Sequence, residues 1–155
     1  MNHTIESIAA FGGVFALLVF VHFAADWVFQ SHDEAMKKAT DSIVRAEHCF
    51  IYSIIFLPFM HALELSTLEA VFCFGLLFCS HFIEDTYYPV LLWAKYVRRP
   101  PEFGAIVLND DQSTGHQLTD HEAFVKWTSS PLGKIIAIVV DQLVHIGFLF
   151  PIAYF

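Results

Sequence analysis

The chain has 155 residues, of which 56% are hydrophobic and 15% charged, with a formal net charge of -8 and a mean hydropathy of +0.55. Soluble domains carry about 25% charged residues, so this composition excludes an ordinary soluble protein and predicts one domain, residues 1–155, within a membrane. The eight Lys and Arg form no basic stripe, which argues against nucleic-acid binding.

Four apolar segments are long enough to span a bilayer, which takes about 20 helical residues. They predict helices at about 8–29, 43–63, 68–97 and 132–155. No alternating apolar and polar pattern indicates a β-barrel. We therefore expect an all-α, integral-membrane four-helix bundle. The tiny connection at 64–67 predicts that the second and third helices form an antiparallel hairpin.

The basic residues predict the orientation. All of them fall in the connections 30–42 and 98–131 or at the helix ends that face these connections. By the positive-inside rule this side is cytoplasmic, so both termini lie on the other side. We expect a multi-pass protein of the bacterial inner membrane with one long cytoplasmic loop, 98–131. This loop holds the turn-rich stretch DDQSTG, and Thr119 is a candidate N-cap for a short helix.

Ionisable side chains interrupt the apolar segments. They are His22, Asp26, His48, His81, Glu84, Asp85, Asp141 and His145. Three aspartates at membrane depth would cost roughly 8–10 kcal/mol even on the lenient insertion scale. No Lys or Arg lies within these segments at that depth, so we expect a divalent cation, or protons, to supply the positive charge.

The spacing of these residues favours a metal. Three pairs stand four residues apart and therefore share a helix face: His22/Asp26, His81/Asp85 and Asp141/His145. The first and third helices run in the same direction and read H-x-x-x-D, whereas the fourth runs the opposite way and reads D-x-x-x-H. All three pairs thus place Asp toward the cytoplasm and His one turn deeper, as a shared site requires.

The predicted ligands are four histidines and three aspartates: His22, Asp26, His48, His81, Asp85, Asp141 and His145. Seven ligands suit two ions bridged by a carboxylate. Mixed imidazole and carboxylate ligands favour Zn, with Mn or Fe as alternatives. Pro89 predicts a bend of the third helix beside Asp85.

Further polar residues surround the predicted ligands. Glu84 is a candidate general base, or a residue of a water-filled cleft, and Gln30 and Gln142 are candidate catalytic or substrate contacts. Three basic residues are candidates for binding an anionic head group, although they serve equally as topology signals: Lys37, Lys38 and Arg45.

The ordered motifs resemble domain-of-unknown-function family 3307, a family of small bacterial and phage membrane proteins with four helices. The residues that carry the resemblance are His22, Asp26, Gln30, Lys37 or Lys38, His48, His81, Asp85, Asp141, Gln142 and His145. The resemblance covers nearly the whole chain and implies the same four-helix fold, but no established activity. The motif style is similar to that of membrane-bound metal-dependent hydrolases, which is an analogy.

The leading hypothesis is a membrane-embedded metal-dependent hydrolase that acts on a lipid or lipid-linked substrate at the cytoplasmic leaflet. One alternative is a transporter or channel for protons or divalent ions. A second is a b-type haem protein, which would explain the histidines but not the aspartates. A third is a membrane scaffold or modulator stabilised by metal. Small residues on the helices permit, but do not demand, a homo-oligomer.

Overall fold

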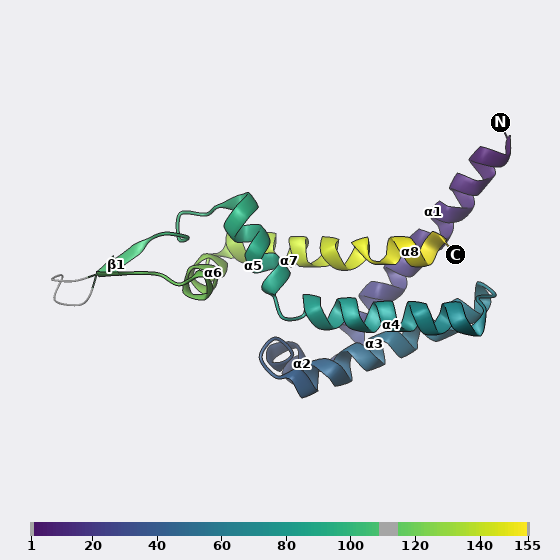
Figure 1. The fold of residues 1–155 in the computed structure, drawn as a ribbon, viewed down its shortest axis with the longest axis horizontal. Helices are drawn as coiled ribbons and strands as arrows, with labels where there is room; N and C mark the ends of the chain where they lie inside the picture. Colours follow the sequence, from purple (N-terminus) through teal and green to yellow (C-terminus); the bar gives the residue numbers. More distant parts are fainter. Residues whose placement is uncertain (1, 109–114, 155) are drawn as a thin grey trace. The chain divides into compact units, whose positions relative to one another are not determined.

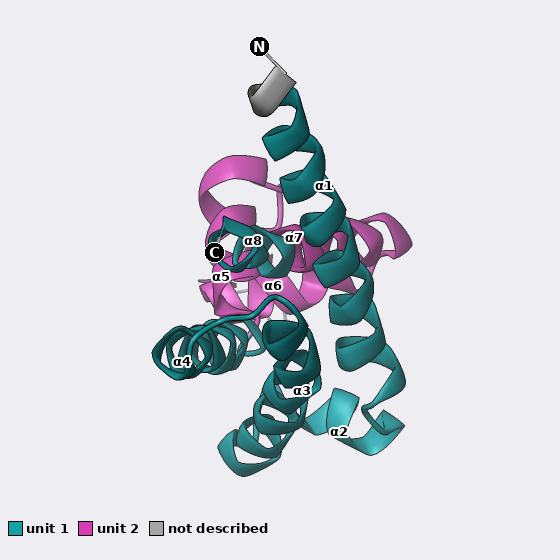
Figure 2. Ribbon diagram, turned by 90° about the vertical axis from the view of Figure 1, so that its right-hand side faces the viewer, with its two compact units in different colours: residues 1–86, 144–155 teal, residues 87–143 magenta. Residues whose placement is uncertain are grey.

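The computed structural model describes residues 2–108 and 115–154. The chain forms two compact units (Figure 2). Unit 1 comprises Met1–Thr86 with Val144–Phe155, and unit 2 comprises Tyr87–Leu143. The expectation that residues 1–155 form a single domain therefore stays a prediction, and the two units are described separately below.

Unit 1 begins with helix α1, Asn2–Phe23, which continues directly into the π-helical turn η1, Ala24–Val28. The short helix α2, His32–Lys37, follows and had not been predicted. Its start is encoded by a capping box, in which the Ser31 hydroxyl accepts from the Glu34 amide and the Glu34 carboxylate accepts from the Ser31 amide. The predicted polar connection 30–42 is thus an ordered part of the fold.

Helices α3, Ser42–Ala62, and α4, Thr67–Glu84, lie side by side and confirm the predicted hairpin (Figure 1). Asp41 caps the start of α3, and Ser66 caps the start of α4 in a second capping box with Glu69. Glu64 takes a left-handed conformation, φ 59°, in the tight connection between the two helices.

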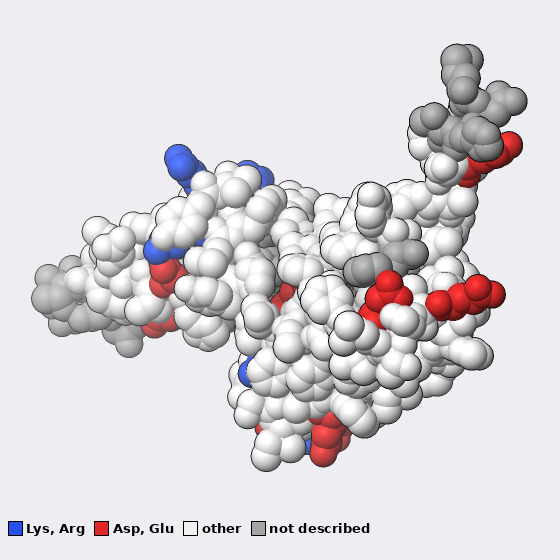
Figure 3. Space-filling model, turned by 45° about the vertical axis from the view of Figure 1, so that its right-hand side comes forward, with Lys and Arg blue, Asp and Glu red and all other residues white. Residues whose placement is uncertain are grey.

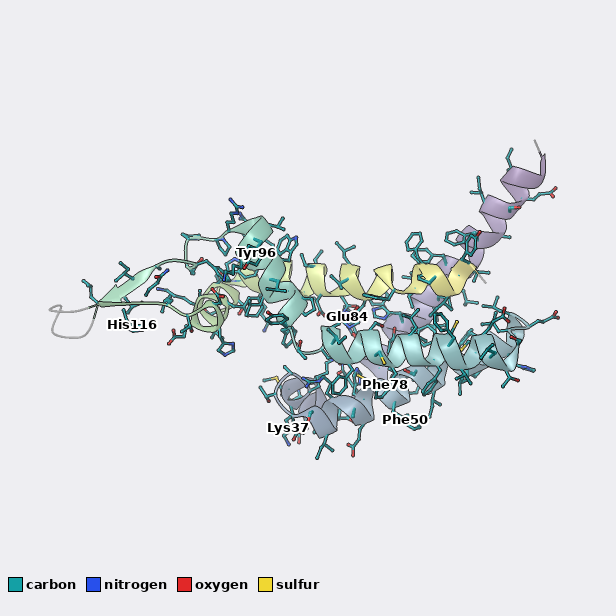
Figure 4. All side chains as sticks on the ribbon, in the orientation of Figure 1. Lys37, Phe50, Phe78, Glu84, Tyr96 and His116 are labelled. Atoms are coloured by element: carbon teal, nitrogen blue, oxygen red, sulfur yellow. The ribbon has the colours of Figure 1, made fainter. Side chains whose placement is uncertain are left out.

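The core of unit 1 is apolar and is built from α1, α3, α4 and α8, Leu149–Tyr154. Its fully buried side chains are Leu18, Val21, Ala25, Tyr52, Phe56, Met60, Cys73, Leu77, Leu149 and Ile152. Phe50 and Phe78 are seen on α3 and α4 (Figure 4). Many large apolar side chains remain exposed on the same helices, among them Phe20 and Phe72, as expected for a surface that meets lipid.

Unit 2 holds the part of the chain that was predicted as a long loop. It contains α5, Tyr88–Trp93, the π-helical turn η2, Ala94–Arg98, and α6, Asp120–Thr128. Helix α7, Pro131–Gly147, begins here. Thr119 caps α6 together with Glu122, as predicted. The core of the unit consists of Val90, Ala94, Phe124, Trp127 and Ala137.

The mostly helical structure agrees with the all-α expectation but differs from the predicted elements in three places. A short antiparallel hairpin pairs β1, Ile106–Leu108, with β2, Gly115–Gln117, within an otherwise helical chain. The turn-rich DDQSTG stretch that joins these strands falls, except for Gly115, outside the described residues. In addition, the third and fourth predicted helices are each divided in two.

The division of the predicted third helix places a site residue at a helix end. Helix α4 ends at Glu84 and Asp85 is its C-cap; Tyr87 is left-handed, φ 57°, and α5 restarts with Pro89 in its first turn. Proline has no N–H to donate to the carbonyl of Asp85 and suits the first turn of a helix, so Pro89 ends one helix and begins another rather than bending one. Pro151 has the same effect after Gly147, because it cannot donate a hydrogen bond to the carbonyl of Gly147.

Four helical segments are long and apolar enough to cross a membrane, in agreement with the four predicted spans: Ile5–Val28, Ser42–Ala62, Thr67–Glu84 and Pro131–Tyr154. Much of the face shown in Figure 3 carries no Lys, Arg, Asp or Glu atoms. The chain is a multi-pass membrane protein of mostly helical structure. The predicted sidedness of its termini stays a prediction.

Candidate metal centre

Four side chains with metal-binding groups meet in the interior of unit 1. Asp26 comes from η1, His48 from α3, His81 from α4, and Asp85 from the C-cap of α4. Each offers one ligand atom, and the four atoms lie within 4.8 Å of one another. None of the four residues is more than 3% exposed. We refer to these four residues as the tetrad.

The separations of the ligand atoms are short. His48 Nε2 lies 3.2 Å from Asp26 Oδ1 and 3.0 Å from His81 Nε2. His81 Nε2 lies 3.5 Å from both Asp26 Oδ1 and Asp85 Oδ2. The distance from His48 Nε2 to Asp85 Oδ2 is 3.7 Å. Bonds of about 2.0–2.2 Å place four tetrahedral ligand atoms of zinc about 3.3–3.6 Å apart, so these separations match a four-coordinate site.

Local structure directs the four side chains to one point. The π-helical turn widens the end of the first span around Asp26, and such turns frequently occur at functional sites. On α4, His81 and Asp85 are four residues apart and therefore lie on one face. Because α4 ends at this point, Asp85 is not constrained by a continuing helix. Asp85 Oδ2 is buried and makes no hydrogen bond within the described part of the chain.

A lysine also reaches the tetrad, and the expectation that no basic side chain does so was wrong. Lys38 Nζ lies 3.1 Å from Asp26 Oδ1 and 2.9 Å from Asp85 Oδ1, with its side chain 8% exposed. It also lies 3.3 Å from His48 Nε2. Burial alone would lower the pKa of Lys38, but the carboxylates of Asp85 and Asp26 raise it above its ordinary value, so the ammonium is charged.

The fold holds this lysine in place through its backbone. Arg45 Nη1 donates to the carbonyl oxygens of Lys38 and Ala39, at 3.0 and 3.1 Å. The guanidinium of Arg45 also lies 4.6 Å from the ring centre of Phe82. Lys38 and Arg45, candidates for binding an anionic head group, are both buried: Lys38 contacts the tetrad and Arg45 contacts the adjoining loop. Their head-group role stays a prediction.

A second group of ligand-type side chains adjoins the tetrad and shares His81 with it. Glu84 and His145 complete this group, and all three side chains are buried. His145 Nε2 lies 3.2 Å from Glu84 Oε2 and 4.0 Å from Asp85 Oδ1. The ring centres of His81 and His145 are 4.5 Å apart. The structure thus brings five of the seven predicted ligands, and Glu84, into one continuous cluster.

Tyr52 is a site residue that the sequence reasoning missed. Its hydroxyl and His22 Nδ1 are hydrogen-bonded at 2.9 Å, and its ring stacks on that of His81 with ring centres 4.0 Å apart. Tyr52 therefore supports one ligand of the tetrad and engages His22, which belongs to neither metal-binding group of the described residues. The sequence did contain a pattern that could have identified Tyr52: it follows His48 by four residues and so shares its helix face.

The remaining predicted site residues lie elsewhere. Lys37 projects from α2 and is exposed (Figure 4), 3.9 Å from Asp33. Gln30 is partly buried and follows the end of η1. Asp141 and Gln142 belong to unit 2, where Gln142 Nε2 lies 3.3 Å from Asp141 Oδ2. The proposed roles of these four residues, and the ligand role of His22, stay predictions.

These observations define a class: a multi-pass, mostly helical membrane protein with a buried cluster of histidines and carboxylates. The chain belongs to the family described as "Protein of unknown function (DUF3307)", which matches residues 14–155 and thus includes every motif residue. This confirms the resemblance inferred from the motifs. No curated protein and no solved structure matches the chain.

Proposed function

We propose that this chain is a membrane-embedded metalloenzyme whose tetrad binds one divalent cation. The observation that carries the proposal is the set of separations of 3.0–3.7 Å among buried ligand atoms from three different helical segments. Two imidazole nitrogens that face each other beside two carboxylates are satisfied together by a cation at their centre. Zinc suits this ligand set best, and Mn or Fe are the alternatives.

The buried charges support a divalent ion. Three carboxylates of the cluster are almost fully buried, those of Asp26, Glu84 and Asp85, whereas Lys38 supplies one positive charge. Two negative charges therefore remain when the histidines are neutral. Isolated buried charges are strongly unfavourable, and one divalent ion would neutralise these two. The prediction of two bound ions was made without Lys38; with Lys38 in place, the charges favour one.

The position of the cluster supports a substrate at the membrane surface. Asp26 lies just before the end of the span Ile5–Val28, and Asp85 directly follows the span Thr67–Glu84. His48 lies in the second turn of the span Ser42–Ala62. All three positions belong to span ends on the same side, which the positive-inside rule assigns to the cytoplasm. The bond to be cleaved would thus belong to the head-group region of a lipid or lipid-linked molecule in the inner membrane of a bacterium.

The residues beside the tetrad suit hydrolysis. A bound divalent cation would supply Lewis acidity; because the tetrad already provides four ligands, an attacking water would have to enter as a fifth ligand, as zinc sites allow when they expand to five-coordinate. Glu84 and His145, whose side chains lie 3.2 Å apart beside the tetrad, would take a proton from the attacking water and deliver one to the leaving group, respectively. Lys38 would stabilise negative charge that develops beside Asp26 and Asp85.

Metal analysis of the purified protein tests the proposal. We expect the wild-type chain in detergent to carry one equivalent of zinc, manganese or iron by elemental analysis, and to lose it to a strong chelator with a fall in thermal stability. A visible spectrum without a haem Soret band should accompany this result. A chain that folds, carries no such metal and takes up none on addition of zinc would overturn the proposal.

Activity and transport are separable in vesicles. Reconstituted, metal-loaded protein should release a water-soluble product from vesicles of a total bacterial lipid extract, detected by mass spectrometry. The chelated protein should not do so. Zinc movement across the vesicle membrane without any lipid product would instead favour the transporter and would contradict the hydrolase.

A further inference from the structure

We propose that Lys38 supplies the charge of a second cation and holds one of its ligand oxygens, so that the wild-type centre is limited to one divalent ion and removal of Lys38 admits a second. The second ion would be held by Glu84 and His145 and joined to the first through Asp85, while His81 stays a ligand of the first. This inference rests on the proposed metal centre, and it assigns Lys38 the role of setting how many ions that centre binds.

The two carboxylate oxygens of Asp85 face different partners. Oδ2 lies 3.5 Å from His81 Nε2 and 3.7 Å from His48 Nε2, on the side of the tetrad. Oδ1 lies 2.9 Å from Lys38 Nζ and 4.0 Å from His145 Nε2. A carboxylate that bridges two metals presents its oxygens in this way, one to each ion. Lys38 therefore binds the oxygen that a second ion would use.

The second group offers donors of the right kind at ligand spacing. The distance of 3.2 Å from Glu84 Oε2 to His145 Nε2 is close to the separation expected of two ligands of one zinc ion, about 3.3–3.6 Å. His81, Glu84 and His145 are each at most 3% exposed.

Charge balance explains why one ion and the lysine exclude a second ion. The carboxylates of Asp26, Glu84 and Asp85 balance one divalent ion and the Lys38 ammonium. A second divalent ion added beside Lys38 would leave two positive charges in excess within a buried site, which is strongly unfavourable. When the lysine is replaced by a neutral residue, the excess is one charge, which a single hydroxide can balance.

Lys38 is held in this position by the fold rather than by its side chain alone. Arg45 donates two hydrogen bonds to the loop, one of them to the carbonyl of Lys38 itself. The neighbouring Lys37, the last residue of α2, carries the same charge, but its side chain is 62% exposed. Lys37 therefore provides a matched control.

Zinc stoichiometry of the full-length chain tests the inference. Wild type, K37M, K38M and K38Q are purified in detergent, equilibrated with zinc, desalted and measured by elemental analysis, with folding checked by circular dichroism. We expect one zinc per chain in wild type and K37M, and two in K38M and K38Q. Adding Glu84→Gln to K38M should return the count to one, which places the second ion on Glu84.

The outcomes distinguish failure of the proposed role of Lys38 from failure of the proposed metal centre. Two zinc ions in the wild type, or one zinc in both folded Lys38 variants, would overturn the role of Lys38 while leaving the metal centre intact. No zinc in wild type and K37M would overturn the metal centre as well. If both neutral variants fail to fold, two measurements still test the inference. The wild type and K38R, which keeps the positive charge, must each bind one zinc ion.

Discussion

Replacing Asp26 with Ala is expected to reduce bound metal from one ion per chain to less than about a tenth under the same purification, since loss even of an indirect contact to a metal ligand typically weakens binding about 10–100-fold. Asp26 Oδ1 lies within 3.5 Å of both tetrad imidazoles and 3.1 Å from Lys38 Nζ. Its removal takes away one ligand and one counter-charge of the lysine together. The measurement is elemental analysis of the purified variant.

The metal loss must be specific to the tetrad. Asp33→Ala is the matched control, because Asp33 is an exposed carboxylate on α2, with its side chain 83% exposed. This variant should keep the wild-type metal content. Asp85→Ala should behave like Asp26→Ala. A folded chain that retains stoichiometric metal after both tetrad substitutions would show that the ion is bound elsewhere.

Glu84→Gln is expected to slow the proposed hydrolysis by about 10²–10⁴-fold, the range that a well-placed general base contributes. Gln keeps the size and hydrogen-bonding capacity of the side chain but cannot accept the proton. In the wild-type centre Glu84 belongs to the second group rather than to the tetrad, so the variant should retain one metal ion. The rate of product release from lipid vesicles and the metal content are measured on the same preparation.

The comparison with a second glutamate makes this result interpretable. Glu47 is exposed and directly precedes His48 on α3, so Glu47→Gln should leave both rate and metal content unchanged. Loss of metal in Glu84→Gln would mean that Glu84 is a ligand of the first ion. An unchanged rate with unchanged metal would remove Glu84 from the chemistry.

Much of the fold, and the His81/Asp85 pair of the site, could be predicted from local sequence patterns. The lengths of the apolar segments predicted the four spans, and the short connection after Ala62 predicted the α3–α4 hairpin. The H-x-x-x-D spacing placed His81 and Asp85 on one helix face, and the two side chains meet in the structure. These features depend only on helix geometry and hydrophobicity, and both can be inferred from local sequence.

Other features depend on tertiary contacts that no local pattern contains. Lys38 was predicted only as a head-group contact or a topology signal, yet Arg45 fixes the loop and the lysine reaches Asp26 and Asp85. The break after Glu84 was missed because apolar residues continue on both sides of it. Here the missing N–H of Pro89, which cannot bond the carbonyl of Asp85, outweighed hydrophobic continuity.

X-ray absorption at the metal edge of the purified, metal-loaded protein tests the central claim most directly. A zinc ion in the tetrad should show about four nitrogen and oxygen neighbours at about 2.0–2.1 Å, with the outer scattering pattern of two imidazole rings. Asp26→Ala should abolish this signal. A shell that contains sulfur at about 2.3 Å, or one without imidazole, would contradict the assignment of the ion to Asp26, His48, His81 and Asp85.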